Sequence, residues 1–229
     1  MLKDAKAAER TYDQGCSLGH LGACTMVGLI AINGDTGTKD KDRGFRYIKK
    51  ACDGGWTYGC LQLGHCYYNG NGVSKDHFKA TDIYQSVCDK KLGDGCHSLG
   101  WQYKLGEGAK KDLARAAELF QAGCDYGSMN SCASLGEMYE AGTGVAKDLA
   151  QAVALKGKAC KAGIERACPK KVAAARGGGG GSCGGGLSMC GGRCVDLRNS
   201  AKNCGRCGFV CPEVCMNGGC VSAGYKYGY

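Results

Sequence analysis

Cysteine is the residue type in this sequence with the most chemistry to offer. The 229-residue chain holds 19 cysteines, and thiols at this density serve as disulfides, metal ligands or redox groups. Ten of them form five pairs with the spacing C-x7-C, and each pair follows the previous one by 36 residues. The pairs are Cys16 and Cys24, Cys52 and Cys60, Cys88 and Cys96, Cys124 and Cys132, and Cys160 and Cys168. Two thiolates with no second pair nearby make a poor tetrahedral zinc site, so we expect disulfides and no metal.

Hydrolytic chemistry finds little support in the sequence. The four histidines, His20, His65, His77 and His97, are isolated from one another, and the motifs S-x-x-K, K-T-G, S-D-N and H-E-x-x-H are absent. The C-x-x-C that ends at Cys207 offers thiol oxidoreductase chemistry, but structural pairing explains it better in so cysteine-dense a region. We therefore expect a protein that is not an enzyme and binds no cofactor.

The 36-residue spacing is not confined to cysteine, so it marks an internal repeat. A Lys-Asp pair and two glycines recur in the same register. The aspartates are Asp4, Asp40, Asp76, Asp112 and Asp148; the glycines are Gly28, Gly64, Gly100 and Gly136, and Gly34, Gly70, Gly106 and Gly142. Repeats of this length bury their apolar faces by stacking, which predicts a solenoid.

Each repeat predicts two helices. The first follows the second cysteine, as in 132–139, where Leu135 and Tyr139 share a face. It ends at a glycine suited to a left-handed C-terminal position, while Gly136 and its equivalents allow a neighbouring helix to approach closely. The second helix starts at the recurring aspartate, where capping explains five copies better than ligand binding does. Its apolar stripe is Leu113, Ala116, Ala117, Phe120 and Cys124.

The repeat is recognisable as a family pattern. The motif L-G-x-x-Y-x-x-G-x-G-V-x-K-D, best matched from Leu135 to Asp148, resembles the Sel1-like repeat, a relative of the tetratricopeptide repeat. The C-x7-C pairs resemble the secreted cysteine-rich Sel1 proteins typified by the Helicobacter cysteine-rich family. The resemblance covers roughly 4–170 and implies an all-α fold, a right-handed α/α superhelical solenoid with a concave groove. The first repeat departs from the motif with Thr36 and Gly37, which leaves its turn open.

Disulfide pairing within each C-x7-C is the simpler arrangement, and it agrees with the resembled family. Pairing of Cys24 with Cys52 stays open, because antiparallel helices bring those ends together. Cys66 has no periodic partner, and its equivalents Ile30, Gln102 and Met138 are too mixed to require burial. It is either a small semi-buried side chain or a thiol that forms an intermolecular disulfide.

The composition changes after the repeats. We expect domains at 1–176 (solenoid) and 183–229 (cysteine-rich module), joined by a glycine linker over 177–182. Disulfides with little regular structure should hold the module; its cysteines are Cys183, Cys190, Cys194, Cys204, Cys207, Cys211, Cys215 and Cys220. The segment 190–220 resembles the Stig1-like module of secreted proteins. The last tyrosines form either a docking strand or a frayed end; they are Tyr225, Tyr227 and Tyr229.

Bulk properties narrow the location and the partners. The net charge of +9 comes without a dense basic block, so nucleic-acid binding is not expected. No apolar run is long enough to span a membrane, and the first residues lack the apolar core of a signal peptide. Abundant disulfides place the protein outside the cell, on its surface or in the periplasm.

The resulting expectation is a non-enzymatic scaffold for protein–protein interaction. One candidate partner is the protein itself, because the repeat pattern starts and stops partway through a unit, which favours head-to-tail contacts and a filament. The alternative, implied by the resemblance, is a penicillin-binding or weak β-lactamase-like protein.

Overall fold

The computed structural model describes residues 2–168 and four short segments at 188–190, 193–195, 214–216 and 219–221. The chain divides into two compact units, Met1–Pro169 and Lys170–Tyr229, which are considered separately. The expected linker and the three terminal tyrosines lie outside the described residues, as do Cys183, Cys204, Cys207 and Cys211.

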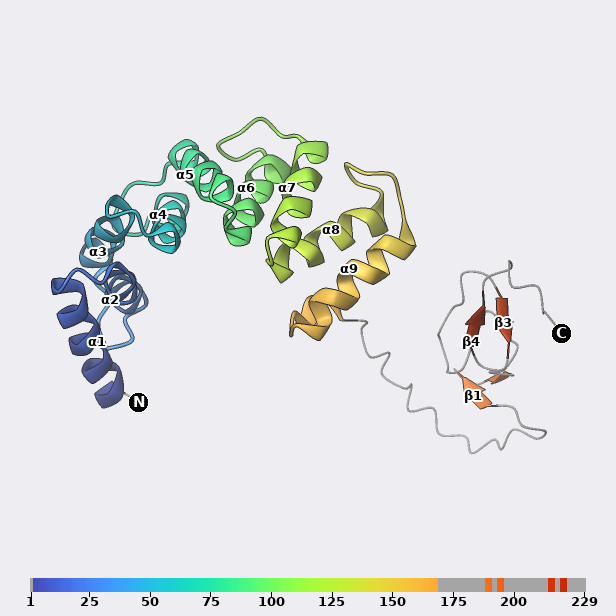
Figure 1. Cartoon of the computed structure of the whole chain (residues 1–229), viewed down its shortest axis with the longest axis horizontal. Coiled ribbons are helices and arrows are strands. Elements are labelled where there is room, and N and C mark those ends of the chain that lie inside the picture. Colours follow the sequence, from blue (N-terminus) through green and yellow to red (C-terminus); the bar gives the residue numbers. More distant parts are fainter. Residues whose placement is uncertain (1, 169–187, 191–192, 196–213, 217–218, 222–229) are drawn as a thin grey trace. The chain divides into compact units, whose positions relative to one another are not determined.

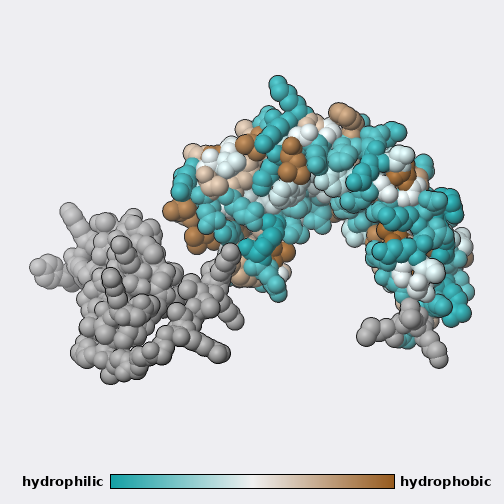
Figure 2. All heavy atoms as spheres, turned by 180° about the vertical axis from the view of Figure 1, so that it is seen from behind, coloured by the Kyte–Doolittle hydropathy of each residue, from teal (hydrophilic) through white to brown (hydrophobic). Residues whose placement is uncertain are grey.

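The first unit is an arch of antiparallel α-helices (Figure 1). Figure 2 shows hydrophobic side chains scattered over its mainly hydrophilic surface. Within residues 2–168 the helices are α1 (Leu2–Ser17), α2 (Leu21–Asn33), α3 (Lys41–Asp53), α4 (Thr57–Asn69), α5 (His77–Asp89), α6 (Gly93–Leu105), α7 (Leu113–Asp125), α8 (Met129–Ala141) and α9 (Leu149–Lys161), followed by the 3-10 turn η1 (Glu165–Ala167). We call α2, α4, α6 and α8 the A helices and the odd-numbered helices the B helices. The predicted all-α repeat solenoid is confirmed.

The recurring aspartates act as helix caps. Asp40, Asp76, Asp112 and Asp148 precede α3, α5, α7 and α9, and each carboxylate accepts a hydrogen bond of 2.8–3.0 Å from the backbone N–H three residues further on. This arrangement satisfies one of the free donors of the first turn. The prediction fails at Asp4, which lies inside α1 because that helix begins at Leu2.

The A helices begin earlier than the sequence suggested. Helix α8 starts at Met129, three residues before Cys132, so the second cysteine of each pair lies in the first helical turn and not ahead of it. The helix ends are as predicted. Gly34, Gly70, Gly106 and Gly142 adopt left-handed φ values between 69° and 82°, and each donates its N–H back to the last turn.

Glycine also sets how closely the two helices of a repeat pack. A Cβ atom on Gly64 would lie 2.5 Å from the Tyr84 ring, and one on Gly100 would lie 2.7 Å from the Phe120 ring. Both distances are too short for any real side chain. The predicted close approach is therefore confirmed, and it lets a large aromatic ring of α5 and of α7 bury itself against the A helix before it.

Five local disulfides close the turns that follow the five B helices. They join Cys16 to Cys24, Cys52 to Cys60, Cys88 to Cys96, Cys124 to Cys132, and Cys160 to Cys168, with Cα atoms 4.4–4.7 Å apart. The alternative pairing of Cys24 with Cys52 is excluded. Each bridge therefore fixes one helical corner.

The described segments of the second unit form two antiparallel hairpins. Strand β1 (Ser188–Cys190) pairs with β2 (Arg193–Val195), and β3 (Val214–Met216) pairs with β4 (Gly219–Val221). In the second hairpin the backbones of Cys215 and Cys220 lie opposite each other. The expectation of little regular structure is thus qualified by two short hairpins.

Candidate binding face on the A helices

The A helices stack in a row along the solenoid, and α2 and α4 lie on the inner side of the arch in Figure 1. Helices α2 and α4 contact each other, as do α6 and α8, and His65 of α4 reaches Ser98 of α6. The residues that maintain the fold recur along this row. One half-buried series varies instead, from Leu29 to His65, Trp101 and Glu137. A constant framework with variable surface side chains is the arrangement expected of a binding face.

The centre of this face is hollowed. A depression of about 280 Å³ lies over α4 and α6, with Tyr84 of α5 in its lining. Its other lining residues are His65, Tyr68, His97, Ser98, Trp101, Gln102 and Leu105. The Leu105 side chain is 49 % exposed, so the hollow offers aromatic and aliphatic surface to a partner beside a few polar groups.

Trp101 is held rigidly at the edge of this hollow. Its indole N–H donates to His97 Nε2 at 3.1 Å, and its ring meets the Phe120 ring edge-on with 6.0 Å between centroids. The Lys104 ammonium lies 4.3 Å from the Trp101 centroid, a cation–π contact. A large amphipathic side chain already fixed in place loses little conformational entropy when it binds a partner.

A chain of polar contacts runs from this hollow towards the end of the solenoid. His65 Nε2 lies 3.3 Å from Ser98 Oγ, and His97 Nε2 lies 3.4 Å from Ser134 Oγ. Arg166 then donates to Ser134 Oγ at 3.3 Å and pairs with Glu137 at 2.7 Å. These contacts link α4, α6, α8 and η1 through their side chains.

Burial sets the protonation of the two histidines. Loss of solvent lowers the pKa of His97 to about 4, with the Arg166 charge acting in the same direction, and burial also lowers the pKa of His65. Both rings are therefore neutral at neutral pH. His97 Nε2 consequently keeps the lone pair that accepts the Trp101 N–H.

The contact between His97 and Ser134 does not make a catalytic pair. The His97 Nε2 atom that faces Ser134 already accepts a hydrogen bond from Trp101, and the low pKa of His97 makes it a weak base at neutral pH. The spacing G-x-S-x-G does occur, around Ser17. Ser17 ends helix α1 and donates its hydroxyl to Asp13 O at 2.9 Å, whereas a nucleophile elbow needs a strand-to-helix turn.

Cys66 lies behind the binding face and not on it. Its side chain is 2 % exposed, and burial raises the pKa of the thiol to about 11. Its equivalents Ile30, Gln102 and Met138 are buried as well, so the expectation that this position need not be buried is wrong. The mixed chemistry of the series hid a shared environment. Burial favours a packing role for this free thiol over an intermolecular disulfide.

No helix in the described part of the chain is both long and apolar enough to cross a bilayer. The described residues also contain no group of three or more histidine, cysteine or acidic side chains arranged to hold a metal ion.

Fold and repeat motif together define an α/α solenoid of the Sel1 type. The Sel1 repeat family matches residues 22–56, 57–91, 93–128 and 130–164, and the chain belongs to this family. Sel1 repeats are typically protein-interaction modules. A comparison with curated protein sequences finds no significant match.

Several solved structures are similar to the chain. A protective antigen of uropathogenic Escherichia coli is 28 % identical with a TM-score of 0.63, over 70 % of this chain and 34 % of that one. A Sel1 repeat protein from Oxalobacter formigenes is 21 % identical with a TM-score of 0.64, over 69 % and 63 %. Cysteine-rich protein B of Helicobacter pylori is 32 % identical with a TM-score of 0.46, over 58 % and 95 %. The chain thus spans about a third of the first protein and under two thirds of the second.

Proposed function

We propose that this protein is an extracellular or periplasmic scaffold that binds an extended protein segment along the A helices. The observation that carries the proposal is Trp101, which lies at the edge of the hollow over α4 and α6 on the A-helix binding face. Its aromatic side chain is held there by His97, Phe120 and Lys104. Aromatic anchors in partly formed pockets supply much of the affinity of protein interfaces.

The surrounding side chains indicate what the segment looks like. Leu105 and Tyr68 suit an apolar residue, and Lys104 adds positive charge. Glu137, paired with Arg166, offers hydrogen bonds on the next A helix, α8. A segment with one large apolar side chain next to an acidic residue fits this order. The proposed ligand is therefore an apolar-acidic stretch of polypeptide.

The disulfides support the proposed location. Five bridges in a thin stack persist where the environment is oxidising. The cysteine-rich region after the solenoid is proposed to be a disulfide-held module of the Stig1-like type, which agrees with export.

A selected-peptide experiment tests the binding face. Peptides chosen from a random display library on the full chain should bind with micromolar constants, and Trp101→Ala should weaken that binding about tenfold or more. Phe78→Ala is the matched control, because Phe78 is 73 % exposed at the start of the B helix α5. Peptides that bind the Trp101→Ala variant as tightly as the wild type would contradict the proposal.

The same preparation tests the enzymatic alternative. A non-enzymatic scaffold should turn over a chromogenic β-lactam no faster than heat-denatured protein does. Clear turnover above that background would favour the β-lactamase-like alternative.

A second surface favours self-association as a further part of this role. Val153 and Leu149 of α9 are 72 % and 56 % exposed, whereas Ala117, the equivalent of Val153 in α7, is 4 % exposed beneath the next repeat. A hollow of about 590 Å³ lies alongside, over Gly157 and Lys158. We propose that a helix from a second copy covers this face, in the manner of a following repeat.

A further inference from the structure

The loops from A helix to B helix pack in one repeated way. In three of them the second glycine rests on the first turn of the preceding B helix. A Cβ atom on Gly72, Gly108 or Gly144 would lie 2.1–2.3 Å from the carbonyl oxygen of Lys41, His77 or Leu113. Only glycine permits this contact, so the loop lies directly on that helix.

The first loop lacks the two residues that hold the other loops against the preceding B helix. Thr36 stands where the other loops have the seated glycine, and its Cβ could not enter the same contact. Gly37 stands where Val73 and Val145 pack against the core. The first loop therefore has neither the glycine of that backbone contact nor the valine of that apolar anchor.

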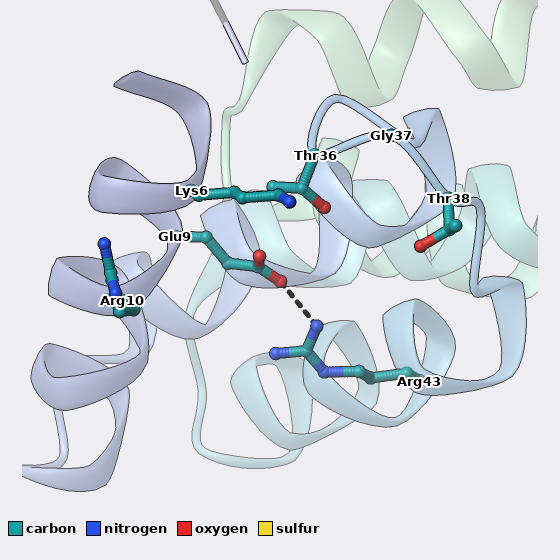
Figure 3. A pocket seen from close by; sticks show the side chains of 7 residues that line it. All are labelled: Lys6, Glu9, Arg10, Thr36, Gly37, Thr38 and Arg43. Atoms are coloured by element: carbon teal, nitrogen blue, oxygen red, sulfur yellow. Dashed lines mark hydrogen bonds and ion pairs between the residues drawn. The ribbon is translucent and has the colours of Figure 1, made fainter. Parts of the chain in front are cut away.

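A hollow of about 650 Å³ lies between this loop, α1 and α3 (Figure 3). Its lining is polar: Lys6, Glu9 and Arg10 from α1, Thr36, Gly37 and Thr38 from the loop, and Arg43 from α3. The volume falls within the range of small-molecule sites. The departure of one repeat from the motif thus leaves a space that the other loops fill.

The charges in this hollow are unbalanced. Arg43 is paired with Glu9 at 2.5 Å, and Figure 3 shows the two side chains reaching towards each other. Lys6 and Arg10 are exposed and make no ion pair with any side chain of residues 4–168. Lys6 extends towards the Thr36 hydroxyl (Figure 3). Lys6 and the hydroxyls of Thr36 and Thr38 face this space, and Arg10 lines it from the side of α1 farther from the loop (Figure 3).

We propose that this hollow binds a small polar organic anion, a phosphate or carboxylate carried on a hydroxylated body. Lys6 and Arg10 supply charge-assisted hydrogen bonds to the acidic group, and Thr36 and Thr38 supply hydroxyls for the body. The site is open to solvent, so affinity is modest and sensitive to salt. It is separate from the face around Trp101, and neither proposal depends on the other.

Calorimetry or amide chemical-shift titration of the full chain at low salt tests this site. Glucose 6-phosphate and glucuronate are the two probes, and glucose is the neutral control. At least one anion should bind with a constant on the order of 1 mM, and glucose should not. The preferred anion identifies the acidic group. Failure of both anions to bind, or equal binding of glucose, would overturn the proposal.

Two variants separate a shaped site from diffuse surface charge. Thr36→Gly with Gly37→Val restores the repeat motif and fills the hollow without changing any charge, so binding should fall about tenfold or more. Lys6→Ala with Arg10→Ala should weaken it to a similar degree. Lys110→Ala with Lys111→Ala removes the same charge from the third loop and should leave binding unchanged. Undiminished binding by the loop variant, in protein that circular dichroism shows to be folded, would rule the site out.

Discussion

Lys91 has a positive φ at a position where the other four repeats have glycine. Gly19, Gly55, Gly127 and Gly163 have φ values of 90–92°, and Lys91 has φ 60°, the one positive-φ residue other than glycine in the described part of the chain. A side chain in the left-handed region costs roughly 1 kcal/mol relative to glycine. This turn therefore carries a local strain that its counterparts lack.

Lys91→Gly should raise the free energy of unfolding by about 1 kcal/mol, measured by denaturant titration with the disulfides intact. Gly127→Ala is the matched control. A Cβ there meets no atom within 4 Å, so its expected loss of about 1 kcal/mol is conformational. A destabilised Lys91→Gly variant would show that the lysine side chain makes a contact worth more than the strain.

His97 should make stability depend on pH. Its pKa in the folded protein is about 4, below the ordinary value of 6.5, so between these values the unfolded chain binds the proton more readily. The contribution of the neutral ring is complete above pH 6.5 and is lost as the pH falls towards 4. The midpoint of thermal unfolding should drop across this window, and less steeply in His97→Gln. Parallel curves for the two proteins would exclude His97 as the cause.

For single residues, the sequence predicted the roles of those that recur in every repeat, but not the roles of those that occur once. Four aspartate caps followed from one recurring residue next to each helix start. The burial of Cys66 did not follow, since Gln102 at the equivalent position suggested a solvent-facing side. Gln102 is nevertheless buried, with Thr81 Oγ1 of α5 lying 3.5 Å from its side-chain oxygen, a neighbour that no linear pattern reveals.

The paired helices depend on their disulfide corners. Cys88→Ala with Cys96→Ala opens a loop of eight-residue separation and should lower the free energy of unfolding by about 2–3 kcal/mol, through the greater freedom of the unfolded chain. Denaturant titration measures the loss. Cys66→Ala is the control, since it removes a buried thiol without opening a loop and should cost about 1 kcal/mol. Equal losses in the two proteins would mean that packing, and not the bridge, stabilises the corner.

The starts of the A helices were less predictable than those of the B helices. The residues that precede α2, α4, α6 and α8 are His20, Trp56, Leu92 and Ser128, and of these Ser128 alone accepts a capping hydrogen bond through its side chain. Three of the four A helices thus begin without a chemical signal. The ends of these four A helices were predictable, because each of them ends at a left-handed glycine.

Self-association of two copies is a property of the whole molecule. If a second copy covers α9, the mass from light scattering should rise with protein concentration, and Val153→Glu should hold the protein as a monomer by placing a charge in the contact. Phe78→Glu changes an equally exposed side chain elsewhere and should leave association intact. A monomeric wild type whose mass is unchanged after deletion of 177–229 would contradict self-association.

The architecture of the solenoid could be predicted from spacing, but its binding surfaces could not. A 36-residue period predicts stacked helix pairs whatever their surface residues are. The hollow beside Trp101 depends on side chains from three helices meeting. The hollow beside Thr36 depends on how far one loop stands from α1. Such distances are set by packing in three dimensions.

The five bridged corners also determine how the solenoid would respond to pulling. Each bridge spans eight residues, so about 28 residues of each 36-residue unit can extend under tension, to a length of roughly 100 Å. Reduction would release the rest and add about 25 Å to every unit. A stretched array would thus extend in equal steps, each with a stop set by its covalent bridge, and would return to a chain whose corners are already formed.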